Sequence, residues 1–197
     1  MAKLLYQGHG SFRLTTGDGV VAYLDPFLGE GYEKPADIVM ISHQHDDHNK
    51  INLITQKSDC TVITNVEALA GGKHNTFSVK GIEIEAVIAE NKNHPSDQCV
   101  GFILTADGFK LYFSCDTSKT AMMAELSARK LDYAFLCGDG FYNMDIKEAS
   151  ECAVLIGARH STPVHLKPGE LFDRALAEQF DGPGRLIIEA GEEIELS

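Results

Sequence analysis

The stretch Ser42-His43-Gln44-His45-Asp46-Asp47-His48 decides how the rest of the chain is interpreted. Three of the eight histidines fall within six residues here, with two aspartates between them. Imidazole and carboxylate groups are the preferred ligands of zinc and similar divalent metals. His43 and His45 are two residues apart, so on an extended turn both can reach one ion. Asp47 and His48 diverge from that pair and can serve a second ion.

The segments on either side of this motif favour a site over a solvated polar loop, which composition alone can also produce. Residues 36–41 form a short apolar run with β-branched members, which predicts a buried strand. Asn49 follows the motif and is predicted to cap a helix. A ligand-bearing loop at the end of a buried strand is where layered α/β folds tend to place their sites.

Composition indicates a globular protein with one sizeable core. The chain has 197 residues, of which 44% are hydrophobic and 23% charged. No run approaches the roughly 18 apolar residues of a membrane span, and the first residues turn polar too soon for a secretory signal. The five cysteines are scattered and contain no C-x-x-C pair, which is typical of reduced thiols. We therefore expect a cytoplasmic protein without a membrane partner.

The formal net charge of -12 argues against a nucleic-acid partner, since an acidic surface repels phosphates. Two divalent metals would add about +4 inside the cleft, so the net charge leaves the preference of the site itself open. We expect a small-molecule substrate. Association into a homo-oligomer also stays open.

The order of predicted elements indicates two sheets with helices packed outside, in a single domain spanning residues 1–197. Strands dominate the first part of the chain, and strands alternate with helices in the second. The predicted strands are 3–7, 11–16, 20–24, 36–41, 60–64, 75–79, 82–88, 99–105, 109–114, 133–137, 161–164, 185–188 and 192–196. The predicted helices are 66–70, 120–130, 146–156 and 169–180.

Three more residues of ligand type stand where predicted strands end. They are His94, Asp116 and His165. Each alone is more often a surface residue or a satisfied core residue. Together with the first motif they favour a metal site assembled from several loops. His160 competes with His165 as a ligand, and His165 is preferred because it ends its strand whereas His160 begins it.

The pattern His43-x-His45-x-Asp47-His48, followed by His94, Asp116 and His165, resembles the metallo-β-lactamase superfamily over essentially the whole chain. Two further segments are similar to that family. Tyr23-Leu24-Asp25-Pro26 resembles its strand ending in aspartate, and Ser114-Cys115-Asp116-Thr117 resembles its Gly-Asp-Thr segment with Cys115 in place of glycine. Gly8-His9-Gly10-Ser11-Phe12 and Phe141-Tyr142-Asn143-Met144 are similar to segments of small metal-dependent hydrolases related to ascorbate-6-phosphate lactonase.

The resemblance implies an α/β protein, an αββα sandwich of two mixed β-sheets with helices on the outer faces. It implies a dinuclear site for two divalent metal ions, zinc first, with manganese, nickel or iron as alternatives. Asp116 would bridge the two ions. The implied ligands of the first ion are His43, His45 and His94, and those of the second are Asp47, His48 and His165.

The predicted activity is hydrolysis of an ester, lactone or phosphoester bond by a metal-bridging hydroxide, which Asp47 would also orient. His9 is a candidate substrate contact or hydrogen-bond donor, against the alternative of a plain turn residue. Two rival functions remain. One is a mononuclear iron enzyme like the sulfur dioxygenases of the same superfamily, and the other is a non-catalytic metal-binding module.

Overall fold

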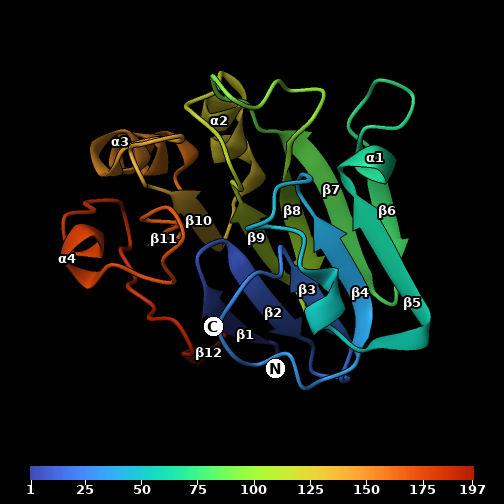
Figure 1. The fold of residues 1–197 in the computed structure, drawn as a ribbon. Helices are drawn as coiled ribbons and strands as arrows, with labels where there is room; N and C mark the ends of the chain where they lie inside the picture. Colours follow the sequence, from blue (N-terminus) through green and yellow to red (C-terminus); the bar gives the residue numbers. More distant parts are fainter.

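The computed structural model describes residues 1–197 and consists of two six-stranded sheets packed face to face (Figure 1). The first sheet has the order β12-β1-β2-β3-β4-β5 and is formed by β1 (Lys3–Gly8), β2 (Ser11–Thr15), β3 (Val21–Leu24), β4 (Ala36–Ile41), β5 (Gln56–Thr64) and β12 (Glu193–Glu195). The second has the order β11-β10-β9-β8-β7-β6 and is formed by β6 (Thr76–Val79), β7 (Ile82–Ile88), β8 (Val100–Ala106), β9 (Phe109–Phe113), β10 (Tyr133–Cys137) and β11 (His160–Val164).

Both sheets are mixed and follow the same pairing pattern. In the first, β12, β1, β2 and β3 pair antiparallel, and β3, β4 and β5 pair parallel. In the second, β6, β7, β8 and β9 pair antiparallel, and β9, β10 and β11 pair parallel. Parallel strands covered on both faces carry continuous apolar runs, which explains why all of β4 and β10 is buried. The predicted fold class is confirmed.

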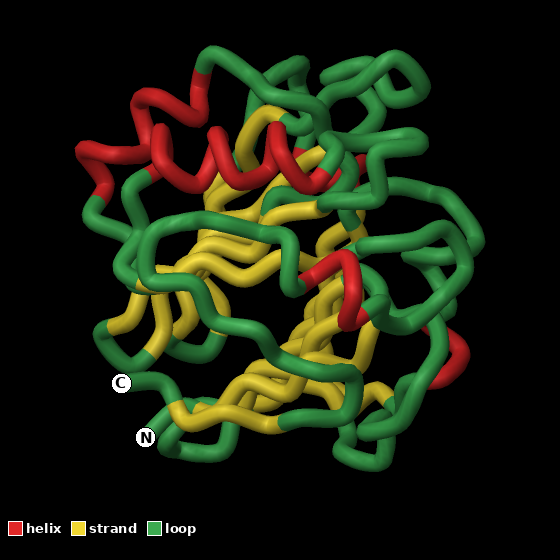
Figure 2. The backbone as a smooth tube through the Cα atoms, turned by 90° about the vertical axis from the view of Figure 1, so that its left-hand side faces the viewer, coloured by secondary structure: helices red, strands yellow, loops and turns green.

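The main core lies between the sheets, where the strands fill the middle of the molecule (Figure 2). Phe12 of β2 packs there with its ring centroid 5.0 Å from that of Phe113 and 4.8 Å from that of Phe135. Burying an aromatic side chain of this kind stabilises the fold by roughly 1.5–3 kcal/mol. The alternation of buried Ile82 and Ile84 with Glu83 in β7 turns one face of that strand to the same core.

Helices cover the outer face of the second sheet. The longest, α3 (Ile146–Ile156), begins at Asp145, whose side chain accepts from the backbone N–H of Glu148. It packs with α2 (Met122–Glu125) and the 3-10 turn η2 (Leu126–Arg129) over the outer side chains of this sheet. The remaining helices are short: α1 (Asn65–Ala68) and α4 (Arg174–Ala177).

The outer face of the first sheet has much less helical cover than expected. The segment after the histidine motif forms only the 3-10 turn η1 (Ile51–Leu53), and the residue before it is Lys50, without a side-chain cap. Asn49 therefore does not cap a helix, contrary to prediction. Ile54, directly after this turn, belongs to a small apolar cluster on that face. Ile51 of the turn and Tyr32 of the loop after β3 pack against the cluster.

Two predictions near the C-terminus are also wrong. Residues 169–180 form only the one-turn helix α4, and residues 185–188 make one isolated bridge, between Arg185 and Ser161. The backbone carbonyls of Glu170 and Leu171 accept hydrogen bonds from His9, so this segment follows a tertiary contact instead of its helical pattern. No helix in the structure combines the length and apolar character that crossing a bilayer requires.

Candidate metal centre

The ligand-type residues converge at one edge of the sandwich because the parallel strands of both sheets end there. Asp25 follows β3 and the histidine motif follows β4. Across the interface Asp116 follows β9 and His165 follows β11. His94 comes from the loop between β7 and β8.

The first group of donors contains His43, His45 and His94. One nitrogen from each lies within 4.8 Å of the others. His94 Nε2 is 3.0 Å from His45 Nδ1, and the ring of His43 lies 4.7 Å from that of His45. Ligand atoms around a tetrahedral zinc ion lie about 3.3 Å apart, so these three histidines are spaced as the ligands of one small cation.

The second group lies around Asp116. Its Oδ1 atom is 3.3 Å from His48 Nε2 and 3.3 Å from His165 Nε2, whereas its Oδ2 atom is 4.0 Å from His43 Nε2. Asp47, His48 and His165 also share a cluster with His9, again within 4.8 Å. The two oxygens of Asp116 therefore face different histidines.

Hydrogen bonds turn the histidine nitrogens toward this centre. Asp25 accepts from His48 Nδ1 at 2.9 Å and from the hydroxyl of Ser42 at 2.6 Å, and that hydroxyl in turn accepts from His43 Nδ1 at 2.9 Å. His94 Nδ1 donates in the same way to Asn91 at 3.1 Å. Because Nδ1 carries the hydrogen in each ring, the lone pair of Nε2 is free to bind a metal ion.

A fit to a cation follows from the polar atoms that lack partners. Four buried polar atoms make no hydrogen bond: the Nε2 atoms of His43, His48 and His165 and the Oδ1 atom of Asp116. The Nε2 atoms of His48 and His165 nevertheless each lie 3.3 Å from that oxygen. Buried polar atoms are rarely left without a partner. A metal ion among them would satisfy the nitrogens and the carboxylate together.

Asp139 is a site residue that the sequence interpretation missed. It follows β10 at the same edge, and its Oδ2 atom lies 3.1 Å from His165 Nδ1. The same oxygen accepts from the side chain of Asn143 at 2.7 Å, and Asn143 accepts from Asn91 at 2.6 Å. A polar chain of three side chains thus joins His165 to His94, one residue from each donor group. The signal was available, because Asp139 follows a strand just as Asp116 does.

His9 is fully buried and lies under the second group. Its Nδ1 atom is 3.1 Å from the carbonyl of Glu170, its Nε2 atom is 3.3 Å from Asp47 Oδ2, and its ring packs on His165 with centroids 3.7 Å apart. Both nitrogens are occupied by protein groups. This position suits a residue that orients Asp47 better than one that contacts the substrate directly.

Charge explains the protonation of the centre. Burial and, after it, the charge of His48 lower the pKa of His43 to about 2, although Asp116 opposes this shift. Burial also opposes protonation of His48, but Asp116 and Asp25 outweigh it and raise its pKa well above the ordinary value. Burial would raise the pKa of Asp116, and the charges of His165 and His48 hold it well below its usual range instead. A divalent cation can replace the protons that these carboxylates attract.

The backbone is left-handed at several site positions, where such angles cost energy in residues other than glycine. The φ angles are 56° at His9, 44° at Asp25, 50° at Cys115 and 46° at His165. Each of these residues lies one or two positions after the end of a strand and turns the chain into the site. Gly10 leaves the room that the centre needs, because a Cβ there would lie 3.1 Å from His48 Cε1.

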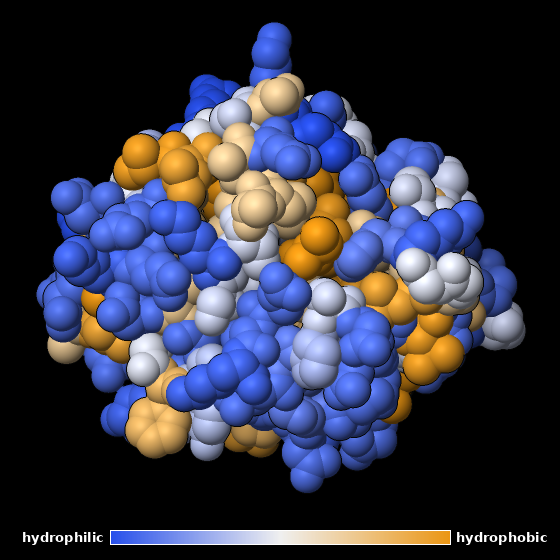
Figure 3. Space-filling view, turned by 90° about the horizontal axis from the view of Figure 1, so that it is seen from above, coloured by the Kyte–Doolittle hydropathy of each residue, from blue (hydrophilic) through white to orange (hydrophobic).

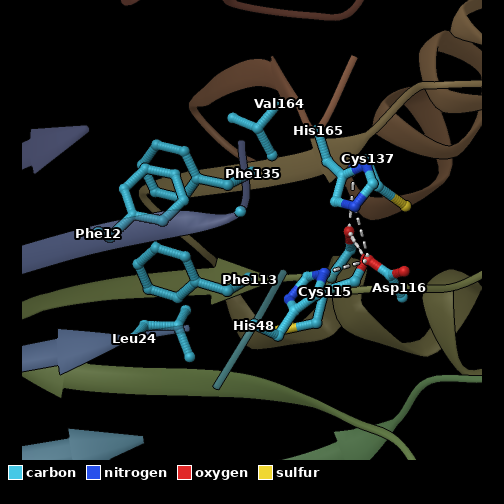
Figure 4. A pocket seen from close by; sticks show the side chains of 12 residues that line it. Phe12, Leu24, His48, Phe113, Cys115, Asp116, Phe135, Cys137, Val164 and His165 are labelled. Carbon is cyan, nitrogen blue, oxygen red and sulfur yellow. Dashed lines mark hydrogen bonds and ion pairs between the residues drawn. The ribbon is translucent and has the colours of Figure 1, made fainter. Parts of the chain in front are cut away.

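An open cleft of about 500 Å³ leads to the centre, lined by residues that include His45, Asp47, His94 and Tyr142. That volume is in the usual range for small-molecule sites. Seen from above, hydrophilic side chains cover most of the molecule, with apolar ones between them (Figure 3). Behind the centre, Figure 4 shows His48, His165 and Asp116 backed by Phe12, Phe113, Phe135, Leu24 and Val164. The space there is about 10 Å³, too small to admit bulk water.

His160, the competing ligand candidate, lies away from the centre, and the Cys115 side chain is packed against apolar groups. His160 is at the opposite end of β11 from His165, and its ring stacks on Tyr133. Cys115 packs against the main apolar core.

A sandwich of two mixed sheets, with histidine and aspartate donors gathered where its parallel strands end, defines the class of the metallo-hydrolases. Residues 3–165 match the family described as "Beta-lactamase superfamily domain". The chain therefore belongs to the metallo-β-lactamase superfamily, as the motif predicted, and is a metal-dependent hydrolase.

Relatives and solved structures agree with this assignment. A UPF0173 metal-dependent hydrolase of Alkaliphilus metalliredigens is 29% identical over 189 residues, covering 83% of this chain and 84% of the relative. A crystal structure named as a metal-dependent hydrolase from Parabacteroides distasonis is 30% identical, with a TM-score of 0.78 over 94% of this chain and 92% of that one. Igni18, a metallo hydrolase of Ignicoccus hospitalis, shares the fold at 21% identity, with a TM-score of 0.72 over 98% of this chain and 97% of that one.

Proposed function

We propose that this protein is a dinuclear hydrolase that cleaves an ester, lactone or phosphoester bond. The observation that carries the proposal is the position of Asp116 between two groups of donors. One oxygen faces His43, and the other faces His48 and His165. A carboxylate has two oxygens and can contact two ions, whereas a histidine offers one nitrogen to one ion.

One ion would be held by His43, His45 and His94, and the other by Asp47, His48 and His165, with Asp116 contacting both. Zinc suits this mixture of imidazole and carboxylate, and manganese, nickel and iron accept the same ligand types. When bound, two divalent ions polarise the scissile bond and lower the pKa of water to near neutrality.

The chain's own residues supply orientation and exclusion of water. Burial would raise the pKa of Asp47, but its contact with His9 and the charge of His48 lower it, so the carboxylate stays ionised. Asp47 lies at the cleft and can accept a hydrogen bond from the attacking water. His9 holds Asp47 in place from behind. Phe12, Phe113 and Phe135 pack behind the centre and exclude bulk water there. The lower local dielectric constant strengthens each electrostatic contact.

The test combines elemental analysis of fully loaded protein with a panel of esters, lactones, phosphomonoesters and phosphodiesters. We expect two ions per chain and hydrolysis of at least one substrate class. Asp116→Ala should lose both metal and activity, whereas Asp46→Ala should keep its metal, because the Asp46 side chain is 97% exposed and paired with Lys50.

Two results would contradict the proposal. The first is no hydrolysis of any class by the metal-loaded wild type. The second is a single ion whose binding is unchanged in His165→Ala. If that ion were iron and the protein consumed oxygen, the dioxygenase alternative would replace the hydrolase.

A further inference from the structure

Two exposed aromatic side chains in the loop after β10 form a pair, here called the aromatic rim, and one of them lines the cleft. Phe141 is 65% exposed and Tyr142 is 46% exposed, and their rings meet edge to face with centroids 5.1 Å apart. Tyr142 lines the cleft together with the metal-centre residues His94 and His165. Large aromatic side chains gain free energy when a ligand covers them. Their position indicates contact with the part of a substrate that projects from the centre.

The loop that carries these rings is fixed in place. Asp139 Oδ1 accepts hydrogen bonds from the backbone N–H groups of Phe141 at 2.6 Å and Tyr142 at 2.8 Å. The N–H of Met144 donates to the carbonyl of Thr117, next to Asp116, at 3.2 Å. Since the other oxygen of Asp139 contacts His165, one carboxylate sets the position of both the aromatic rim and a metal-centre histidine. The loop that carries the aromatic rim is therefore held in a fixed position relative to His165.

The charge of the site favours a neutral reacting group. Four carboxylates surround the histidines, namely Asp25, Asp47, Asp116 and Asp139. They offset the roughly +4 charge that two divalent ions would bring, so the loaded centre has no surplus positive charge for an anion. Asp46 adds a further, exposed carboxylate at the mouth of the cleft.

No lysine or arginine lines the cleft, and two lysines near its mouth are paired with carboxylates. Lys50 Nζ lies 3.5 Å from Asp46, and Lys167 Nζ lies 2.6 Å from Glu170. Lys92 is next to Asn93 in the chain but does not line the cleft. Phosphate sites normally present arginine or lysine to the anion, and this cleft offers aromatic and carboxylate groups in their place.

We propose that the substrate is a carboxylic ester or lactone, uncharged at its reacting carbonyl, with an aromatic ring that packs on Tyr142. This inference rests on the proposed hydrolase function and selects among its substrate classes. Phe141 packs edge to face against the Tyr142 ring, and the phosphoester alternatives are disfavoured.

The test measures binding, so that it does not depend on turnover. Acetohydroxamate and benzohydroxamate carry the same metal-binding group and differ by one aromatic ring. With metal-loaded wild type, calorimetry should give about tenfold tighter binding of benzohydroxamate, the gain expected from one aromatic contact. Tyr142→Ala should abolish that difference while its metal content stays at the wild-type level. Tyr142→Phe should keep it, because the ring is retained.

The outcomes separate this inference from the proposed function. Equal binding of the two hydroxamates, no binding of either, or an unchanged preference in Tyr142→Ala would overturn the aromatic subsite. Catalysis of phosphodiester cleavage in preference to aryl esters would leave the hydrolase standing and refute the substrate class. Absence of all hydrolysis would refute the proposed function, whatever the hydroxamates do.

Discussion

Replacing Asn143 with alanine tests whether the polar chain behind the centre controls metal binding. Asn143 is only 8% exposed, donates to Asp139 at 2.7 Å and accepts from Asn91 at 2.6 Å. Removing its amide deprives both neighbours of a partner, at about 1–3 kcal/mol for each group left unsatisfied. Asp139 keeps its backbone donors, and Asn91 is partly exposed, so the lower end of that range applies to each. We expect a total loss of about 2 kcal/mol.

This loss should fall on metal affinity, because the partners of Asn143 contact His165 and His94. About 2 kcal/mol corresponds to a metal dissociation constant that is roughly 30-fold larger. This is within the range found when the hydrogen-bond partners of metal ligands are removed. Competition with a chromophoric chelator measures it for both ions. Asn93→Ala is the matched control, since Asn93 is an exposed asparagine at the same cleft. Wild-type affinity for both ions in a folded Asn143→Ala protein would refute the reasoning.

Further predictions concern ligand choice, acid stability and rate. His165→Ala should weaken binding of one ion, while His160→Ala should leave metal content unchanged, because His160 lies at the far end of β11; equal loss in both variants would reverse that assignment. Burial would raise the pKa of Asp37, but hydrogen bonds from Lys57, Lys80 and the N–H of Val21 lower it to about 2. The ionised carboxylate therefore stabilises the fold above about pH 4 and loses this effect as pH falls toward 2. Denaturant titration should give Asp37→Asn a free energy of unfolding about 1–2 kcal/mol below that of the wild type at pH 7, and this difference should narrow between pH 4 and about pH 2. A difference that is constant with pH would contradict the prediction. The hydrolysis rate should rise with pH and show an apparent pKa of roughly 6 to 8, because a water molecule whose pKa the bound ions lower would lose its proton in that range. A rate that is flat from pH 5 to 9 would argue against that step.

The strands were largely predictable because apolar runs and turn residues are local signals. Residues 36–41 are buried along their whole length, as their composition requires. The histidine motif and the three strand-end residues were predictable for the same reason, since their placement depends on where strands stop. The boundaries shifted most at β5, where exposed residues 56–59 extend an edge strand without an apolar pattern.

The missed features depend on contacts between distant segments. The helical pattern of residues 169–180 gives way because two carbonyls of that segment bind His9, some 160 residues earlier in the chain. The link between Asn91 and Asn143 spans 52 residues and joins two loops that have no shared periodicity. No local rule reports such pairings, so the supporting contacts of the site emerge only from the folded structure.

The division of the donors between two sheets has a consequence for the order of assembly. Apart from β12, the first sheet is built from residues before 65 and the second from residues after 75, so each can form from nearby chain. The donors come from both, and the centre exists only once the two sheets have docked. Metal binding therefore reports docking more directly than strand formation. In hydrogen exchange, chelation should speed the amides of the loops at the shared edge first, while the amides within β4 and β10 keep their protection until the sheets separate.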